Sequence, residues 1–252
     1  MTRTVAGEAR RVDDEPAFVL HTHPYRETSA IVEAFTEHHG RVALVARGAK
    51  RAHSELRGTL QAFQPVILAW AGARELKTLV RAEWQGGMPL PTGDALLCAF
   101  YVNELLLKLV PREDPHPALF AAYRDTLAAL AGGDAQAPRL RRFEVTLLAE
   151  LGYALDLVHE AGGTTPIDPA ARYHFAVERG ALRLPTRIDT PGIVVHGATL
   201  RALAEGRFAG AATLGEAKRL MRAVLDHYLE SRRLASRRIV QDLQALEGEE
   251  ES

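Results

Sequence analysis

Cysteine is almost absent from this chain, since Cys98 is the only one among 252 residues. A single thiol excludes an intrachain disulfide and any zinc site that needs two or more thiolates. It suits a reducing compartment, and the N-terminus lacks the apolar core of a signal peptide, so we expect a cytoplasmic protein. His21 and His23 have the only metal-like spacing, without an obvious third ligand, so we expect no metal and no other cofactor.

Long apolar runs and an excess of one charge are also missing. The most apolar run, 95–110, is shorter than the roughly 20 residues that span a bilayer and contains Asn103, Glu104 and Lys108. It therefore predicts a buried helix and no membrane partner. The 31 Lys and Arg balance 32 Asp and Glu, so any basic surface must be local. With 47% hydrophobic residues the chain has the composition of a folded protein.

The common enzymatic motifs are missing as well. The sequence has no phosphate-binding loop, dinucleotide fingerprint, nucleophile elbow or HExxH helix. Cys98 lies in an apolar segment, where a small buried side chain is expected more often than a nucleophile. We therefore predict that the protein is not an enzyme.

The first part of the chain has the pattern of a small β-barrel. Short segments of β-type composition are separated by glycine-containing turns, which predicts strands over 17–22, 30–36, 41–46, 65–70 and 76–83. Five strands in this length favour a closed barrel over 1–84.

From residue 85 onward, after a stretch rich in glycine and proline, apolar residues recur every three or four positions. This spacing predicts helices over 93–110, 117–130, 139–151, 198–204, 214–229 and 236–246. Thr213 and Glu216 are spaced as a capping box for the fifth of these helices. The segment 162–197 interrupts the pattern, with a hairpin expected over 172–184. The fold class is thus α+β, with a barrel followed by a helical domain, 85–252, that contains a hairpin insertion.

Positive charge is concentrated in the second half of the predicted barrel. Eight cations stand against Glu55 and Glu75, a local charge of about +6: Arg41, Arg47, Lys50, Arg51, Arg57, Arg74, Lys77 and Arg81. Such a surface favours binding to a polyanion through its phosphates. Phe63 and Trp70 are candidates for stacking on bases, although alternation places them in the core equally well. The alternative is that these cations form an ordinary solvent-exposed surface of the barrel and bind no ligand.

Two further cationic groups lie in the helical part. Lys218 and Arg222 share a helix face, and with Arg219 they lie beside an apolar stripe of Met221, Val224 and Leu225. A basic rim around an apolar groove suits an acidic peptide with a hydrophobic end. A wholly buried stripe with a solvated cationic face is the alternative. The third group begins another helix: Arg139, Arg141 and Arg142.

Several segments together resemble the RecO family of bacterial recombination mediators. The N-terminal domain of that family is similar to 11–29, 40–51, 60–65 and 75–79, and its later motifs are similar to 142–153, 227–229 and 234–237. The resemblance implies an OB-fold followed by a helical domain, acting without enzymatic chemistry in RecF-pathway DNA repair and recombination. The implied activities are binding single- and double-stranded DNA, annealing strands, and helping RecA load onto DNA coated by single-stranded-DNA-binding protein (SSB).

The resemblance also implies partners and a site. RecR and the acidic SSB tail are the implied proteins, with a cytoplasmic, nucleoid-associated location. Many members carry a four-cysteine zinc module where this chain has 159–184 without cysteine, so it resembles a zinc-free branch in which a hairpin with Tyr173 and Phe175 packs instead.

The expected DNA contacts are Arg41, Arg47, Lys50, Arg51, Arg57 and Lys77, and the expected tail contacts are Lys218, Arg219 and Arg222. Of the DNA contacts, Arg57 and Lys77 rest on charge alone. Two other functions stay open, an OB-fold adaptor for RNA or protein and a metal-dependent nuclease.

Overall fold

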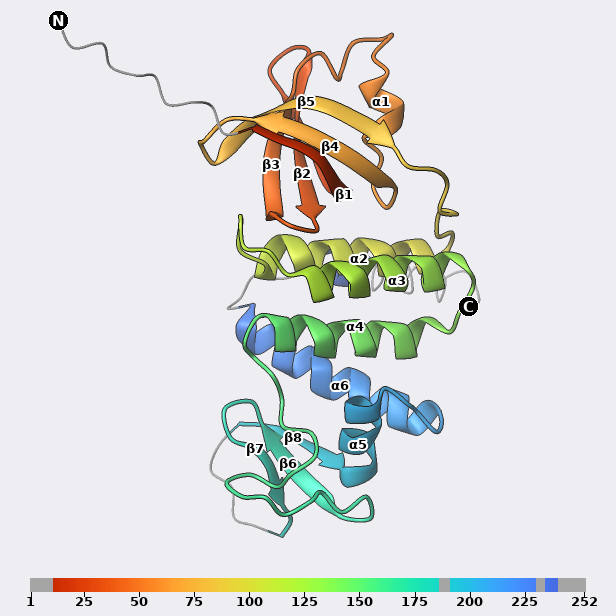
Figure 1. The fold of residues 1–252 in the computed structure, drawn as a ribbon. Coiled ribbons are helices and arrows are strands. Elements are labelled where there is room, and N and C mark those ends of the chain that lie inside the picture. The colour runs from red at the N-terminus through yellow and green to blue at the C-terminus, as the bar shows by residue number, and fades with distance from the viewer. Residues whose placement is uncertain (1–10, 186–190, 230–233, 240–252) are drawn as a thin grey trace, which may run out of the picture. The chain divides into compact units, whose positions relative to one another are not determined.

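The computed structural model describes residues 11–185, 191–229 and 234–239. Its architecture confirms the α+β expectation, with a closed barrel followed by helices (Figure 1). The chain packs as two units. The barrel unit contains the described residues up to Leu90 together with Val110–Ala121, and the helical unit contains Pro91–Leu109 and the described residues from Ala122 onward. The predicted boundary after residue 84 thus lies near the first change of unit, but the return of Val110–Ala121 to the barrel was not foreseen.

The barrel has five strands in the order β1-β2-β3-β5-β4, closed by pairing of β4 with β1. Neighbours are antiparallel except β3 and β5, which are parallel, and this is the order of an OB-fold. The strands are β1 (Arg11–Tyr25), β2 (Ser29–Thr36), β3 (Gly40–Ala46), β4 (Pro65–Ala71) and β5 (Leu76–Trp84). A single-turn helix, α1 (Leu56–Thr59), connects β3 to β4 and was not predicted.

Residues 17–20 in the middle of β1 are apolar on both faces because each face is covered there. Ala17 and Val19 belong to the barrel core, together with Trp70. The side chain of Phe18, which alternates with them, contacts Phe120, with ring centroids 5.6 Å apart. Phe120 lies in Val110–Ala121, so this returning segment buries an outer face of the barrel.

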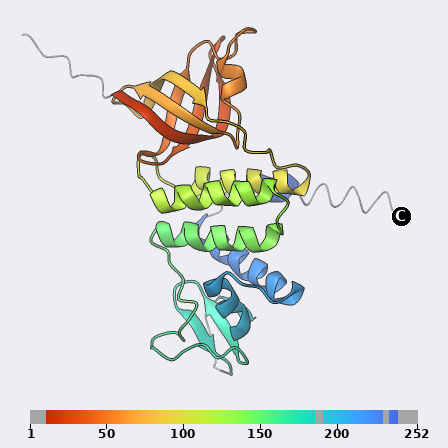
Figure 2. The ribbon, with the colours of Figure 1, turned by 45° about the vertical axis from the view of Figure 1, so that its right-hand side comes forward.

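The helical unit follows the predicted periodicity closely. Its helices are α2 (Asp94–Leu109), the larger part of α3 (Pro117–Ala131), α4 (Gln136–Glu150), α5 (Gly197–Glu205) and α6 (Ala211–Tyr228). Helix α4 contacts both α2 and α6, and both ribbon views show α6 running alongside α4 (Figure 2). In the described part of the chain no helix has the length and apolarity of a membrane span. The predicted last helix is present over 235–239, and 240–246 lie outside the described residues.

The insertion forms a small antiparallel sheet of order β7-β6-β8, with β6 (Arg172–Ala176), β7 (Gly180–Arg183) and β8 (Ile193–His196). The hairpin was predicted and β8 was not. Tyr173 and Phe175 are buried, as the comparison with the zinc-free branch implied. The Tyr173 hydroxyl donates to Glu160 at 2.9 Å and accepts from the backbone N–H of Asp168 at 2.9 Å. Arg183 adds an ion pair of 2.6 Å to Asp168, so polar contacts tie the hairpin to the segment before it.

The predicted capping box at Thr213 is wrong. Helix α6 begins two residues earlier, at Ala211, and its N-cap position is Gly210. The Glu216 carboxylate instead accepts hydrogen bonds from the backbone N–H of His196, at 3.0 Å, and from the Thr199 hydroxyl. Glu216 therefore stabilises the start of α5, where a negative charge also complements the helix dipole. Sequence spacing could not reveal that Glu216 binds His196 and Thr199, because they belong to other elements and lie 20 and 17 residues before it in the chain.

Glu104 of α2 stabilises the start of the helical segment 235–239 in the same way. Its carboxylate accepts the backbone N–H of Ala235 at 2.7 Å and that of Ser236 at 2.9 Å, together with the Ser236 hydroxyl at 2.6 Å. Burial raises the pKa of Glu104, but these hydrogen bonds outweigh burial and lower the pKa below its ordinary value of 4.5. The ionised form is therefore the one that the fold stabilises.

This geometry predicts an acid-sensitive stability. A carboxyl whose pKa is lowered by folding contributes stability above its unfolded pKa of 4.5 and loses that contribution as the pH falls through the folded value. Between about pH 6 and pH 3 the unfolding free energy of the wild type should fall more steeply than that of Glu104→Gln. Urea titrations at each pH measure it, with the exposed Glu178→Gln as the control. Equal slopes in wild type and Glu104→Gln would contradict the prediction.

Candidate nucleic-acid interface

Five exposed cations gather on the loops at one end of the barrel. Four were predicted from the sequence, and the fold adds Arg26 from the β1–β2 turn. We call them the loop cluster: Arg26, Arg47, Lys50, Arg51 and Arg57. None of the five forms an ion pair with a residue in 11–185, 191–229 or 234–239. Their charge is thus available to an anionic ligand.

Backbone contacts bring the two loops of the cluster together. The amide N–H of Lys50 donates to the Thr28 carbonyl at 3.0 Å, and the Lys50 ammonium donates to the Arg26 carbonyl at 3.4 Å. Gly48 has a φ of +70°, a conformation that glycine adopts readily. The Arg51 N–H donates to the Gly48 carbonyl at 3.0 Å and closes the turn. The turn therefore places Arg47, Lys50 and Arg51 next to the β1–β2 turn.

A hollow of about 260 Å³ lies beside the cluster. Lys50 and Arg57 line it, and Ala30, Ala49 and Leu60 supply apolar surface. The Thr22 side chain adds a hydroxyl from β1. An apolar floor with two cations at its edge is suited to a ligand that combines a flat organic ring with phosphate.

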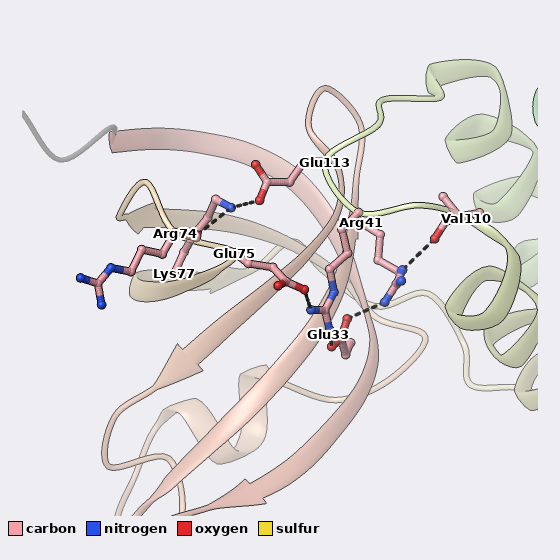
Figure 3. A network of polar contacts seen from close by, with 8 residues as sticks. Glu33, Arg41, Arg74, Glu75, Lys77, Val110 and Glu113 are labelled. Carbon is pink, nitrogen blue, oxygen red and sulfur yellow. Dashed lines mark hydrogen bonds and ion pairs between the residues drawn. The ribbon is translucent and has the colours of Figure 1, made fainter.

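Arg41 has a different environment from the loop cluster. Its side chain is 14% exposed, and its guanidinium pairs with Glu33 of β2 at 2.9 Å and donates to the Val110 carbonyl at 3.1 Å (Figure 3). Arg112 reaches the second oxygen of Glu33 and also pairs with Glu75. Burial lowers the pKa of Arg41, and Glu33 opposes that shift. These contacts give Arg41 a structural role, in binding the segment after α2 to the barrel.

Lys77 lies in a second part of the same network. It is buried on β5, its ammonium pairs with Glu113, and it donates to the Arg74 carbonyl at 3.3 Å. Figure 3 shows the Arg74 side chain directed away from this network. Gly40 permits the close approach of the segment, since a Cβ there would collide with the carbonyl of Asp114. The two predicted DNA contacts Arg41 and Lys77 thus differ from the loop cluster, because a carboxylate neutralises each of them.

The local charge of the barrel is lower than the sequence count of about +6 suggested. Arg81, for example, pairs with Asp14 and lies 3.3 Å from Glu83. The neutralising carboxylates come from β1, β2, the end of β5 and the segment after α2, all outside the stretch that was counted. Pairing in the fold therefore leaves the loops, and not the strands, as the basic part of the barrel.

Neither predicted stacking residue is available to a base. Trp70 is 1% exposed in the barrel core, where its ring contacts that of His39, and Phe63 is 4% exposed. The prediction of a stacking role for them is wrong because both side chains fill the core. The exposed tryptophan is Trp84, at the end of β5, and sequence alternation gave no reason to single it out.

The predicted peptide groove on α6 is also wrong in its apolar half. Met221, Val224 and Leu225 have no exposed surface, so they belong to the core of the helical unit. Lys218 and Arg222 are exposed and form no ion pair with described residues, whereas Arg219 lies 3.8 Å from Glu216.

The third cationic group has structural partners. Arg139 pairs with Asp134 at 2.6 Å, and the Arg142 guanidinium donates to the Gly206 carbonyl at 2.7 Å. Arg141 is buried and pairs with Glu144. This group is therefore not a free cationic surface.

The histidine pair and the single cysteine are the residues to consider as metal ligands or as a nucleophile. The rings of His21 and His23 are adjacent, with centroids 4.2 Å apart, but the described residues contain no group of three or more His, Cys, Asp or Glu that could hold a metal ion. Burial, and to a smaller extent the negative charge of Asp94, raise the pKa of the Cys98 thiol, which disfavours the nucleophilic thiolate.

Comparison with known proteins decides the family. The N-terminal model of recombination protein O matches residues 13–88, and its C-terminal model matches 90–238. The chain belongs to the RecO family. A DNA repair protein RecO from Aromatoleum aromaticum is 52% identical over 95% of this chain and 99% of its own length. Those from Azoarcus sp. and Dechloromonas aromatica are 50% and 48% identical, over 93% and 94% of this chain and 97% and 98% of theirs. RecO is a family of DNA repair proteins and not a known enzyme family, and membership supports a role in DNA repair.

The ion-pair network generates a prediction that separates Arg41 from the loop cluster. Arg41→Ala leaves a buried carboxylate with one partner fewer and should lower the unfolding free energy by about 3 kcal/mol. Arg47→Ala, which removes an exposed cation that has no ion pair among the described residues, should change it by less than about 0.5 kcal/mol. Chemical denaturation of both variants measures this. A stable Arg41→Ala protein with weakened DNA binding would contradict this prediction and indicate that Arg41 contacts DNA.

Proposed function

We propose that this protein is a recombination mediator of DNA repair that binds single- and double-stranded DNA through the loop cluster of its barrel. The observation that supports it is a set of cations that form no ion pair with the described residues, in a chain whose net charge is only −1: Arg26, Arg47, Lys50, Arg51 and Arg57. Phosphates are neutralised by such side chains without base recognition, so both forms of DNA are suitable ligands.

The same cations suit the annealing of complementary strands. Two strands repel each other through their phosphates, and a protein that neutralises part of this charge lowers the barrier to their approach. Base pairing then supplies the driving force, so no bond is made or broken by the protein. This is consistent with a function that needs neither a catalytic group nor a bound metal.

Family membership extends the proposal to partner proteins. We propose that the chain acts with RecR and helps RecA load onto single strands coated by SSB, in the cytoplasm at the nucleoid. For the acidic SSB tail we propose a contact with the cations of α6, Lys218, Arg219 and Arg222. The apolar end of the tail would need a surface other than Met221, Val224 and Leu225, which are buried.

The two other functions that the sequence left open predict different results in one assay. A mediator accelerates the annealing of labelled complementary oligonucleotides, with and without SSB. An adaptor for RNA or protein does not, and a metal-dependent nuclease shortens the labelled strand when magnesium is added. Shortening without annealing would refute the proposed function.

The loop cluster predicts a specific decrease in DNA binding. Lys50→Ala with Arg51→Ala should weaken binding and reduce the magnitude of the slope of log affinity against log salt by about one for each phosphate that is no longer neutralised. Arg172→Ala with Arg179→Ala removes the same net charge from the hairpin of the helical unit and serves as the matched control. Fluorescence anisotropy over a salt series measures both. A folded Lys50→Ala/Arg51→Ala protein with unchanged slope and affinity would exclude these residues.

The α6 cations predict a separate decrease in peptide binding. Lys218→Glu with Arg222→Glu should cost about 2 kcal/mol of affinity for an SSB tail peptide, because repulsion replaces an attractive interaction. Binding to naked DNA should change much less. Isothermal titration compares this variant with Arg172→Glu/Arg179→Glu, which has the same net charge. If the peptide binds both variants equally, the tail contacts another surface.

A further inference from the structure

Trp84 is a large aromatic side chain that the fold leaves in solvent. It ends β5 and is 56% exposed, whereas the other tryptophan, Trp70, is 1% exposed. The ring borders a hollow of about 460 Å³ whose other walls include Thr59, Gln61, Met88 and Leu90. All of these residues belong to the barrel unit.

Hydrogen bonds and backbone contact fix the Trp84 ring. The indole N–H donates to the Gln64 side-chain oxygen at 3.1 Å, and the Gln64 amide donates to the Met88 carbonyl at 2.9 Å. Gln64 is itself buried. Gly87 packs against the ring, since a Cβ at that position would lie 3.6 Å from Cζ2. The polar edge of the indole is thus satisfied and held in place, while much of its surface stays open, which is the arrangement of a preorganised binding surface.

The hollow lies next to the loop cluster. Gly58 and Thr59 of α1 line the hollow at Trp84, and Arg57 of the same helix turn lines the hollow that contains Lys50. A ligand that extends along α1 would therefore meet cations on one side and an aromatic ring on the other. Single-stranded nucleic acid has this pattern, with phosphates at regular intervals and unpaired bases between them.

We propose that Trp84 stacks on an unpaired base of the strand whose phosphates contact the loop cluster. The proposal rests on the proposed DNA-binding function and adds a specificity to it. A base within a duplex is already stacked on its neighbours and is not free to lie on Trp84, whereas a base of a single strand is. Trp84 therefore favours single-stranded over double-stranded DNA, and the cations alone bind both.

The test compares stacking with charge neutralisation. Trp84→Ala should weaken binding to labelled oligo(dT) by roughly 5-fold to 100-fold, the range expected when one base is no longer stacked. Trp84→Phe keeps an aromatic face and should retain most of the affinity. Affinity for a duplex of equal length, and for an oligonucleotide without bases, should be the same for wild type and Trp84→Ala. Val80→Ala, which shortens another exposed apolar side chain of β5, is the matched control.

Intrinsic fluorescence gives a second readout that does not depend on the stability of Trp84→Ala. The chain has two tryptophans, and the buried Trp70 should respond little to DNA. Oligo(dT) should quench the wild type and leave Trp84→Phe largely unquenched, at concentrations where anisotropy shows both bound. Wild-type binding without quenching, together with unchanged affinity of Trp84→Ala, would overturn the stacking proposal.

The outcomes separate this proposal from the function on which it rests. If wild-type protein fails to bind any labelled DNA, both fail. If Lys50→Ala/Arg51→Ala weakens binding and Trp84→Ala does not, the DNA-binding proposal stands and the stacking proposal fails. If Trp84→Ala weakens binding of an SSB tail peptide and leaves oligo(dT) binding unchanged, the hollow is a protein-docking site and the stacking proposal is wrong.

Discussion

The buried carboxylate of Glu33 is the interaction on which the barrel unit depends. Its side chain is 7% exposed, and its two oxygens receive guanidinium groups from Arg41 of β3 and from Arg112, which follows α2 in the chain. An unpaired carboxylate at this depth would be strongly destabilising, and the two arginines together satisfy both of its oxygens. The pairing brings Val110–Ala121 back to the barrel, and Phe120 in that segment then covers Phe18 and Phe35.

This network separates two groups among the basic residues of the barrel. Arg41, Lys77 and Arg81 lie on strands and are neutralised by carboxylates from elsewhere in the barrel unit. The loop cluster has no such partners among the described residues, so its charge is directed at solvent. The division explains how a chain of nearly balanced charge can offer phosphate a basic surface. It also explains why mutating an arginine of the barrel can change stability and leave DNA binding unchanged.

Polar contacts also stabilise the β6–β8 insertion. The sequence has no thiolates there with which to hold zinc. Instead Tyr173 is buried with its hydroxyl bonded to Glu160 and Asp168, and Arg183 pairs with Asp168 and lies 3.4 Å from Glu160. Two carboxylates, a phenol and a guanidinium thereby join the hairpin to the preceding segment, as shared ligands of a metal ion would.

The sequence by itself determined most of the elements, because their signals are local, but it did not show the short α1 and β8. Short β-type segments between glycine-containing turns located all five barrel strands, and three- and four-residue spacing located α2 to α6, since both signals are contained in consecutive residues. Order and spacing of segments also indicated the family. Only the tertiary structure decided which charges are free and which aromatic rings are exposed. Arg41 and Lys77 are neutralised by Glu33 and Glu113, which lie outside the counted stretch, and the exposed Trp84 ring is fixed by Gln64, whose amide donates to the Met88 carbonyl. Ion pairing and exposure depend on residues distant in the chain, and no local pattern contains them.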